Sequence, residues 1–445
     1  MRNQQTQAEL SPASRALIDM GAAAIDLPGG DIDWLTQLRG DALRRFGEAG
    51  LPTPKLEDWK YTDLKALNQA NLVLRSTVAA DAAAKADPDF APGVRHRMRF
   101  QDGRFVAAPS MVDDLPKGVT FTPLSQALID MPDALRVHLE QNDAGALCDL
   151  NAAYLGEGAL ITVDSTADEE LNLALEFFAS DSGADMPVYH PRNVVLVQGG
   201  AKVTLLEFHG GEAGAAYFVN HVTSIAIEDG ATLNHVKWFG DSSGAFNTSL
   251  TRVRVGQGGY YGSAILATGG RLLRNEIRIE LAEQGAETDL AGVYLGRGGQ
   301  HIDQTTRIDH LVPNTTSRQI FRGALDEKAR AVFQGNIVVA KGADGSDGRL
   351  ANGTIMLSEG CEIDTKPQLE IYADDVKCAH GSTVGELDDE ALFYLRSRGV
   401  PLAEARAMLV EGFVGTVYDH MDGLGGVAEL LRGIAGWLAA LEQDA

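Results

Sequence analysis

The stretches Gln198-Gly-Gly-Ala-Lys-Val203 and Glu228-Asp-Gly-Ala-Thr-Leu233 decide the fold of this chain. In each of them an apolar run ends in a glycine turn, and a second apolar run follows at once. The phrase returns in altered form as Gly256-Gln-Gly-Gly-Tyr-Tyr261. The turn glycines are 30 and 29 residues apart, counted from Gly200 to Gly230 to Gly259. A repeat of that length, built from short strands without helical spacers, predicts the stacked coils of a β-solenoid, or β-helix.

Strand-like alternation of apolar residues extends on both sides of this repeat. The runs are Ala159–Val163, Asn193–Val197, Lys202–Leu206, Ser224–Glu228, Arg252–Val255, Glu276–Glu280 and Asn336–Ala340. A β-sandwich is the competing interpretation, but its turns would recur at roughly 8–12 residues without a longer period. We therefore expect a mainly β protein with a solenoid core.

Helical periodicity flanks the predicted core. It occurs within the first 65 residues, where Gly50-Leu-Pro52 ends the pattern, and again at about 124–142. Residues 79–93, rich in Ala, Asp and Pro, look like a linker. After Gly385, helices are expected at about 387–396, 402–413 and 424–442, and they should also cap the open edge of the sheet. The predicted units are an N-terminal helical and mixed domain (1–150), the β-helix core (151–385) and a C-terminal helical domain (386–445).

The composition of the chain argues against several classes of function. The chain has 445 residues and a formal net charge of −24 at pH 7, which disfavours binding to nucleic acids and anionic membranes. Three cysteines do not make a disulfide framework and fit a reducing compartment. The N-terminus lacks the apolar segment of a signal peptide, and no run of about 18 apolar residues occurs. We expect a cytoplasmic protein.

The stretch Pro367-Gln-Leu-Glu-Ile-Tyr-Ala-Asp-Asp-Val-Lys-Cys-Ala-His-Gly381 carries the strongest chemical signal. It places Cys378 and His380 two residues apart at the end of an extended apolar run. In a β-strand these two side chains project from the same face, so the thiol and the imidazole would lie side by side and could bind a metal. The alternative is a cysteine that packs inward beside a histidine that faces solvent.

A second candidate site is the stretch from His301 to His310, which also contains Asp303. A histidine and a carboxylate at positions i and i+2 could bind a metal or polarise a base. The alternative is a polar strand face that is hydrogen-bonded to its neighbours. The remaining histidines of the β region are interpreted as surface or packing residues, and Cys148 as structural; these histidines are His190, His209, His221 and His235.

Several catalytic motifs are absent from the sequence. There is no Gly-x-x-x-x-Gly-Lys-Ser/Thr phosphate loop, no Gly-x-Ser-x-Gly and no His-Glu-x-x-His. Cys-x-x-Cys is also missing, so neither a zinc ribbon nor a self-contained cysteine-rich iron–sulfur site is supported.

The C-terminal third closely resembles the SufB/SufD family of iron–sulfur cluster assembly scaffolds. The residues that carry the resemblance are Arg349–Ser358, Asp364–Gly381 and Leu392–Gly399, with weaker similarity at His301–His310, Phe333–Val338 and Gly50–Pro54. SufB-like chains carry a cysteine where this chain has Asn352, and a glutamate where it has Gly381. The chain is therefore more similar to the SufD branch.

The resemblance implies a right-handed parallel β-helix between helical terminal domains. It also implies a complex with SufB and two copies of the ATPase SufC, supplied with sulfur by SufS and SufE. His380 matches a histidine at the interface with SufB, where a nascent cluster forms, and Cys378 matches the neighbouring motif cysteine. The segment 386–445 matches the region that docks SufC.

These implications describe a scaffold subunit without an active site of its own. One histidine with at most one cysteine cannot hold a cluster, which usually takes four ligands. No cofactor would then be bound stably by this chain alone, and a transient iron–sulfur cluster would lie at the interface with SufB. Two other functions stay open: a β-helix carbohydrate-active enzyme with clustered acids, and a stand-alone metal-binding protein that uses His301, Asp303 and His310.

Overall fold

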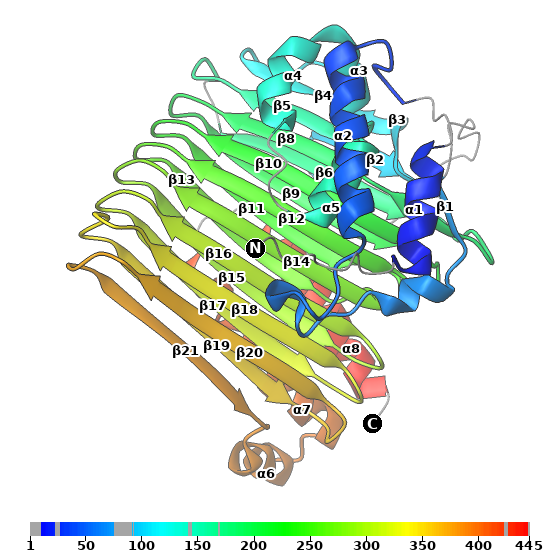
Figure 1. Ribbon diagram of the computed structural model, residues 1–445. Coiled ribbons are helices and arrows are strands. Elements are labelled where there is room, and N and C mark those ends of the chain that lie inside the picture. The colour runs from blue at the N-terminus through cyan, green and yellow to red at the C-terminus, as the bar shows by residue number, and fades with distance from the viewer. Residues whose placement is uncertain are drawn as a thin grey trace, which may run out of the picture.

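The chain folds around two parallel β-sheets that are wound into one solenoid (Figure 1). The computed structural model describes residues 10–22, 27–74, 91, 93–140, 145–167, 170–421 and 426–443. Successive strands of the core alternate between an 11-stranded and a 10-stranded sheet, called here sheet A and sheet B. Each coil therefore contributes one strand to each sheet.

The strands of both sheets stack in chain order, with neighbours about one coil apart in sequence. Sheet A contains β5 (Ala159–Val163), β8 (Arg192–Val197), β10 (Phe218–Ile227), β12 (Phe246–Val255), β14 (Leu272–Leu281), β16 (His301–His310), β18 (Arg330–Val339) and β20 (Glu362–Ile371). Sheet B contains β6 (Leu171–Ala179), β9 (Lys202–Gly211), β11 (Thr232–Gly240), β13 (Tyr260–Ala267), β15 (Glu287–Gly296), β17 (Thr316–Leu325), β19 (Asp347–Met356) and β21 (Lys377–Gly385). Neighbours in these series pair in parallel, for example β10 with β12 and β9 with β11. The predicted solenoid is thereby confirmed, and the antiparallel sandwich is excluded.

A column of left-handed turn residues joins the two sheets along one edge. The Gly200 N–H donates to the Asp229 carbonyl, and the Gly230 N–H donates to the Gln257 carbonyl. The next member of the column is Gly258, with a φ of 60°, and not Gly259 as the sequence phrase suggested. The first glycine of the Gly258-Gly259 pair takes the left-handed position because the turn requires a positive φ there. The predicted period of the turn glycines is therefore correct, except that the third turn glycine is Gly258 and not Gly259.

N-terminal helices cover the outer face of sheet A (Figure 1). They are α1 (Pro12–Ala22), α2 (Asp33–Ala49), α3 (Leu124–Asp130), α4 (Pro132–Leu139) and α5 (Ala146–Ala153). Apolar residues of the helices pack in one cluster with Val194, Phe218 and Phe246 of the sheet. The helix expected over 124–142 is divided at Pro132, whose ring favours the first position of a new helix.

The chain also contains strands that the sequence patterns did not reveal. These are β1 (Leu72–Leu74), β2 (His96–Gln101), β3 (Arg104–Met111), β4 (Val119–Pro123) and β7 (Met186–Tyr189). In sheet B, β2 and β3 follow β6, whereas in sheet A the strand β4 follows β5. The first coil of the solenoid is therefore covered. Most of the expected linker at 79–93 lies outside the described residues.

The C-terminal helices lie on the outer face of sheet B. They are α6 (Asp389–Ser397), α7 (Leu402–Gly415) and α8 (Val427–Gln443), close to the predicted ranges. Residues of α7 and α8 form one apolar cluster with Leu206, Val236 and Leu266 of the sheet. The expectation that these helices cap the open edge was wrong, because the apolar surface that they bury lies on the face of the sheet. None of the described helices combines the length and the apolar character that crossing a membrane requires.

Candidate functional site

The motif from Pro367 to Gly381 forms the last coil of the solenoid. It covers the second half of β20, a turn at residues 372–376 and the first half of β21. Among the described residues, β20 pairs only with β18, and β21 only with β19, so each is the last strand of its sheet in this part of the chain. Side chains of β20 and β21 that a further coil would cover therefore remain exposed on this last coil.

Cys378 and His380 lie on the interior face of β21, as their spacing predicts. In the parallel register with β19, Cys378 lies next to Gly348, and His380 lies next to Leu350. Leu350 is 3% exposed and belongs to the solenoid core, whereas His380 is exposed. The difference arises because no strand follows β21. An imidazole at this position is available to a second molecule.

Cys378 packs against the core and lies near His310. The Cys378 Sγ and the His310 Nε2 are each 3.5 Å from the position that a Cβ on Gly348 would take. The absence of a side chain at Gly348 leaves the space that these two groups share. Burial raises the pKa of the Cys378 thiol, and the charge of Asp347 raises it further, although the Gly348 backbone opposes this. A raised pKa favours the neutral form of the thiol.

The acidic residues of the motif support the coil and do not converge on Cys378. Glu370 accepts a hydrogen bond of 2.7 Å from the Asn336 amide and one of 3.2 Å from the Tyr372 hydroxyl. The backbone N–H groups of Asp374 and Asp375 donate to the Asp344 carboxylate. These contacts fix the turn that positions β21.

His301 and Asp303 anchor an N-terminal segment to the outer face of sheet A. The Thr62 hydroxyl lies 2.9 Å from His301 Nε2 and donates a hydrogen bond of 2.5 Å to Asp303. Asp303 also forms an ion pair of 2.5 Å with Arg274, whose guanidinium lies 4.3 Å from the centre of the Trp59 ring. Asp303 is completely buried, and the site is a closed polar contact between two parts of the chain.

The three residues of the alternative metal site do not meet. His301 begins β16 and His310 ends it, which separates them by nine residue steps, or about 30 Å. Odd-numbered residues of the strand face the N-terminal segment, whereas His310 faces the interior and lies 2.8 Å from Thr315 Oγ1 and 2.9 Å from Ser317 Oγ. One ion could not contact all three residues. The hypothesis of a joint site at His301, Asp303 and His310 was therefore wrong.

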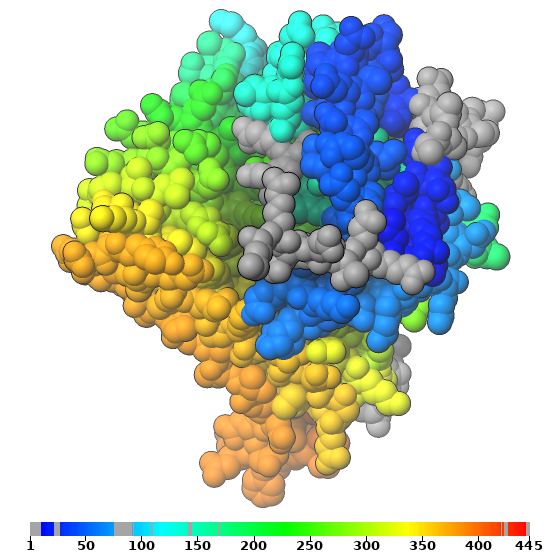
Figure 2. Space-filling model, viewed as in Figure 1, coloured from blue at the N-terminus to red at the C-terminus, as the bar shows by residue number. Residues whose placement is uncertain are grey.

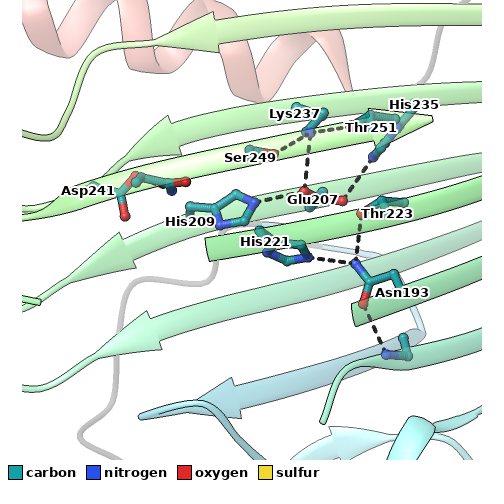
Figure 3. A network of polar contacts seen from close by, with 12 residues as sticks. Asn193, Glu207, His209, His221, Thr223, His235, Lys237, Asp241, Ser249 and Thr251 are labelled. Carbon is teal, nitrogen blue, oxygen red and sulfur yellow. Dashed lines mark hydrogen bonds and ion pairs between the residues drawn. The ribbon is translucent and has the colours of Figure 1, made fainter. Parts of the chain in front are cut away.

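A buried polar network lies inside the first coils of the solenoid and includes three histidines that the sequence analysis interpreted as surface or packing residues (Figure 3). Its centre is Glu207, which is completely buried. Glu207 Oε1 lies 2.7 Å from His209 Nε2 and 3.5 Å from Lys237 Nζ, and Oε2 lies 3.1 Å from His235 Nε2. His221 lies beside His209, with ring centres 4.9 Å apart.

The network has the composition of a metal site but the bonding of a closed ion pair. Among the described residues, Glu207, His209 and His221 form a group of possible ligands whose atoms lie within 4.8 Å of one another. However, the Glu207 carboxylate already faces three donors. The Asn193 amide donates to His221 Nε2, since its oxygen accepts from the Ala159 N–H. His221 Nε2 is thus already used as an acceptor, whereas His221 Nδ1 is buried without a hydrogen-bond partner among the described residues.

Electrostatics support this interpretation. Burial would raise the pKa of Glu207, but the charge of Lys237 and the hydrogen bonds from His209 and His235 hold it well below its ordinary value. Burial lowers the pKa of both His235 and Lys237, and the Glu207 charge opposes that shift. The network therefore contains one carboxylate and one ammonium that neutralise each other.

The coil period was the signal that could have revealed this network. Glu207 is paired with Lys237, and Leu205 with His235, in the register of β9 and β11. Residues 30 positions apart therefore lie next to each other in the sheet. His209 and His221 meet from opposite sheets, and no sequence period encodes that contact.

Two family models match most of the chain. The family model described as "SUF system FeS cluster assembly, SufBD core domain" matches residues 178–413, and "SufBD protein N-terminal region" matches residues 26–173. The chain is 28% identical over 397 residues to an iron–sulfur cluster assembly SufBD family protein of Synechocystis, covering 87% of each chain. It is 28% identical over 385 residues to the iron–sulfur cluster assembly protein SufD of Escherichia coli, covering 85% of this chain and 87% of the relative. The SufD of Bacillus subtilis is 24% identical over 402 residues, with 87% and 90% covered.

Proposed function

The chain belongs to the SufBD family of iron–sulfur cluster assembly proteins, and from this premise we propose that it is a non-catalytic scaffold subunit of the SufD type. It shares its cluster-assembly site with a SufB-type partner, and the site lies where the two solenoids meet. The two subunits work with the ATPase SufC, and sulfur arrives through SufS and SufE.

The uncovered last coil is the observation that carries this proposal. The residues of β20 and β21 are exposed or half-buried, whereas the preceding strands β18 and β19 are largely buried. Ile371, Tyr372 and Val384 expose 41%, 61% and 48% of their surface there. Unpaired strand edges with exposed apolar side chains favour pairing with another chain. A second solenoid of the same family has the matching geometry.

His380 and Cys378 supply half of a ligand set at this end. A neutral imidazole binds iron well, and a thiolate is the usual ligand of iron–sulfur clusters. Two ligands do not complete a cluster, so the partner contributes the others. The cluster is cargo that forms transiently at the interface, and no cofactor is bound stably by this chain alone.

The segment 386–445 docks SufC in this proposal. No residue of α6 is buried, and Phe393 and Tyr394 expose 76% and 57% of their surface. In Figure 2 this helix projects from the body of the molecule, next to the last coil. A partner that moves α6 and α7 would act close to β21, which couples ATP-driven motion to the shared site.

Co-expression with SufB and SufC tests the proposal. We expect all three chains to co-purify. Val384→Lys on β21 should remove SufB from the complex, because it places a charge in the apolar interface, whereas Phe393→Asp on α6 should remove SufC alone. Val137→Lys on α4 is the matched control, since Val137 is 61% exposed but lies far from both surfaces.

Two outcomes would contradict the proposal. If the wild-type chain purifies as a monomer that binds neither SufB nor SufC, the proposed scaffold function is wrong. Loss of SufB from the Val137→Lys variant as well would show that the effect of Val384→Lys is not specific to the last coil.

A further inference from the structure

Cys148 lies in the first turn of α5, beneath the N-terminal helices. The helix starts after Gly145, and Cys148 is its third residue. The Cys148 thiol is 1% exposed and lies 3.8 Å from Nη1 of Arg192 on β8. The partial positive charge of a helix N-terminus and a neighbouring guanidinium both favour a thiolate.

Arg192 is a buried cation that has no carboxylate partner among the described residues. Its side chain is 1% exposed, and its Nε and Nη2 atoms have no hydrogen-bond partner. Nη1 contacts only Cys148 and, at 3.4 Å, the Asn151 amide oxygen. The adjacent acid, Asp149, forms an ion pair of 2.7 Å with Arg45 instead.

The electrostatics around Arg192 require an anion. Burial lowers the pKa of the Arg192 guanidinium, Cys148 raises it, and the charge of Arg252 lowers it. An arginine is not deprotonated in proteins, and a buried charge without a counter-charge is strongly destabilising. Of the groups around Arg192 that can carry a negative charge, the Cys148 sulfur is the one in contact with it.

A cavity leads to Cys148 from the outer face of sheet A. It has a volume of about 260 Å³ and lies between the segment containing Trp59 and the start of α5. Cys148 lines it together with polar residues of β10 and β12, among them Asn220 and Thr248. The cavity is large enough for small solutes, so a thiol with almost no exposure to bulk solvent can still be reached.

We propose that Cys148 is a reactive thiol, whose anion is held by Arg192, and that it is a site of oxidation by small peroxides. The thiolate sulfur attacks one oxygen of hydrogen peroxide, and an S–O bond forms as the O–O bond breaks. The sulfur loses two electrons and becomes sulfenic acid, while the departing hydroxide takes a proton and leaves as water. This inference is independent of the proposed scaffold function.

Trapping of sulfenic acid with dimedone tests the proposal on the full chain. The protein is treated with hydrogen peroxide at equal concentration, and mass spectrometry of peptides follows all three cysteines over time. We expect Cys148 to react about tenfold faster than Cys361 and Cys378, although both are more exposed, because its thiolate is stabilised. Reaction of Cys148 only after addition of denaturant would overturn the proposal.

Two substitutions of Arg192 separate charge from packing. Arg192→Met should lower the oxidation rate of Cys148 about tenfold. Arg192→Lys should restore much of that rate, because a nearby positive charge stabilises the thiolate. Cys361 and Cys378 serve as internal controls, and their rates should not change. An equal or faster rate at Cys148 in a folded Arg192→Met variant, judged by its circular dichroism, would contradict a role for the guanidinium.

Discussion

At the scale of single residues, position along the solenoid decides what each histidine can do. His209 and His235 lie inside, where Glu207 takes up their hydrogen bonds. His380 occupies the same kind of interior-facing position, but on the last coil, and therefore stays exposed. A histidine at the end of the solenoid stays accessible because no further described strand covers it.

His380→Ala should leave the three-subunit complex intact and lower iron–sulfur maturation in cells by about tenfold or more, as losses around metal sites commonly do. The measurement is the activity of an iron–sulfur enzyme in cells whose own copy of this protein has been deleted. Lys377→Ala is the control, because Lys377 is exposed on the same strand. Normal maturation in the His380→Ala variant would exclude His380 from the site.

Glu207→Gln should lower the free energy of unfolding by about 3–5 kcal/mol, because it leaves the buried Lys237 ammonium without its counter-charge. Urea denaturation provides the measurement. The double variant Glu207→Gln, Lys237→Met should recover most of this loss, since it removes both charges. A single variant that loses less than about 1 kcal/mol would show that Lys237 is neutral in the folded protein.

At the scale of elements, the segment at residues 57–69 links the N-terminal helices to the late coils. It contains the 3₁₀ helices η1 (Glu57–Trp59) and η2 (Lys65–Gln69). Glu57 forms an ion pair of 2.5 Å with Lys366 on β20, and Thr62 contacts β16. The segment at residues 57–69 therefore extends the N-terminal contacts with the outer face of sheet A as far as β20, on the last coil.

Asp303→Asn should detach this segment. The change removes one of the two counter-charges of the buried Arg274, which keeps its ion pair of 3.0 Å with Glu276, so we expect a loss of about 1.5–3 kcal/mol in the free energy of unfolding. Faster hydrogen exchange at residues 57–69 would show the detachment directly. Asp309→Asn, on the same face of β16, is the control: its partner Arg307 is 46% exposed, and such pairs contribute about 0–1 kcal/mol. Equal effects of the two variants would contradict the anchoring role of Asp303.

At the scale of the whole molecule, the two ends of the solenoid differ. β2, β3 and β4 extend the sheets beyond the first coil, whereas β20 and β21 end them without a cover. The N-terminal and C-terminal helices occupy the two outer faces, which leaves the last coil as the open surface of the core (Figures 1 and 2). In the proposed function, this asymmetry leaves one end at which a related solenoid can add.

Much of the core was predictable because its contacts repeat at a fixed spacing. The glycine turns and apolar runs predicted the solenoid, and helical periodicity predicted α2, α7 and α8 to within a few residues. The strands β2 and β3 were missed, although in His96–Gln101 the basic Arg97 and Arg99 alternate with the buried Met98 and Phe100. The division of one expected helix into α3 and α4 followed from Pro132, whose effect was visible in the sequence but was not used.

The sequence by itself determined the periodic features of this protein: the parallel coils, the flanking helices, and the adjacent placement of Cys378 and His380 on one strand face. Each of these depends on contacts at fixed separations along the chain. Only the tertiary structure decided which candidates meet, because those contacts join residues from different sheets. It separated His301 from His310, joined Glu207 with three basic side chains, and placed Arg192 against Cys148.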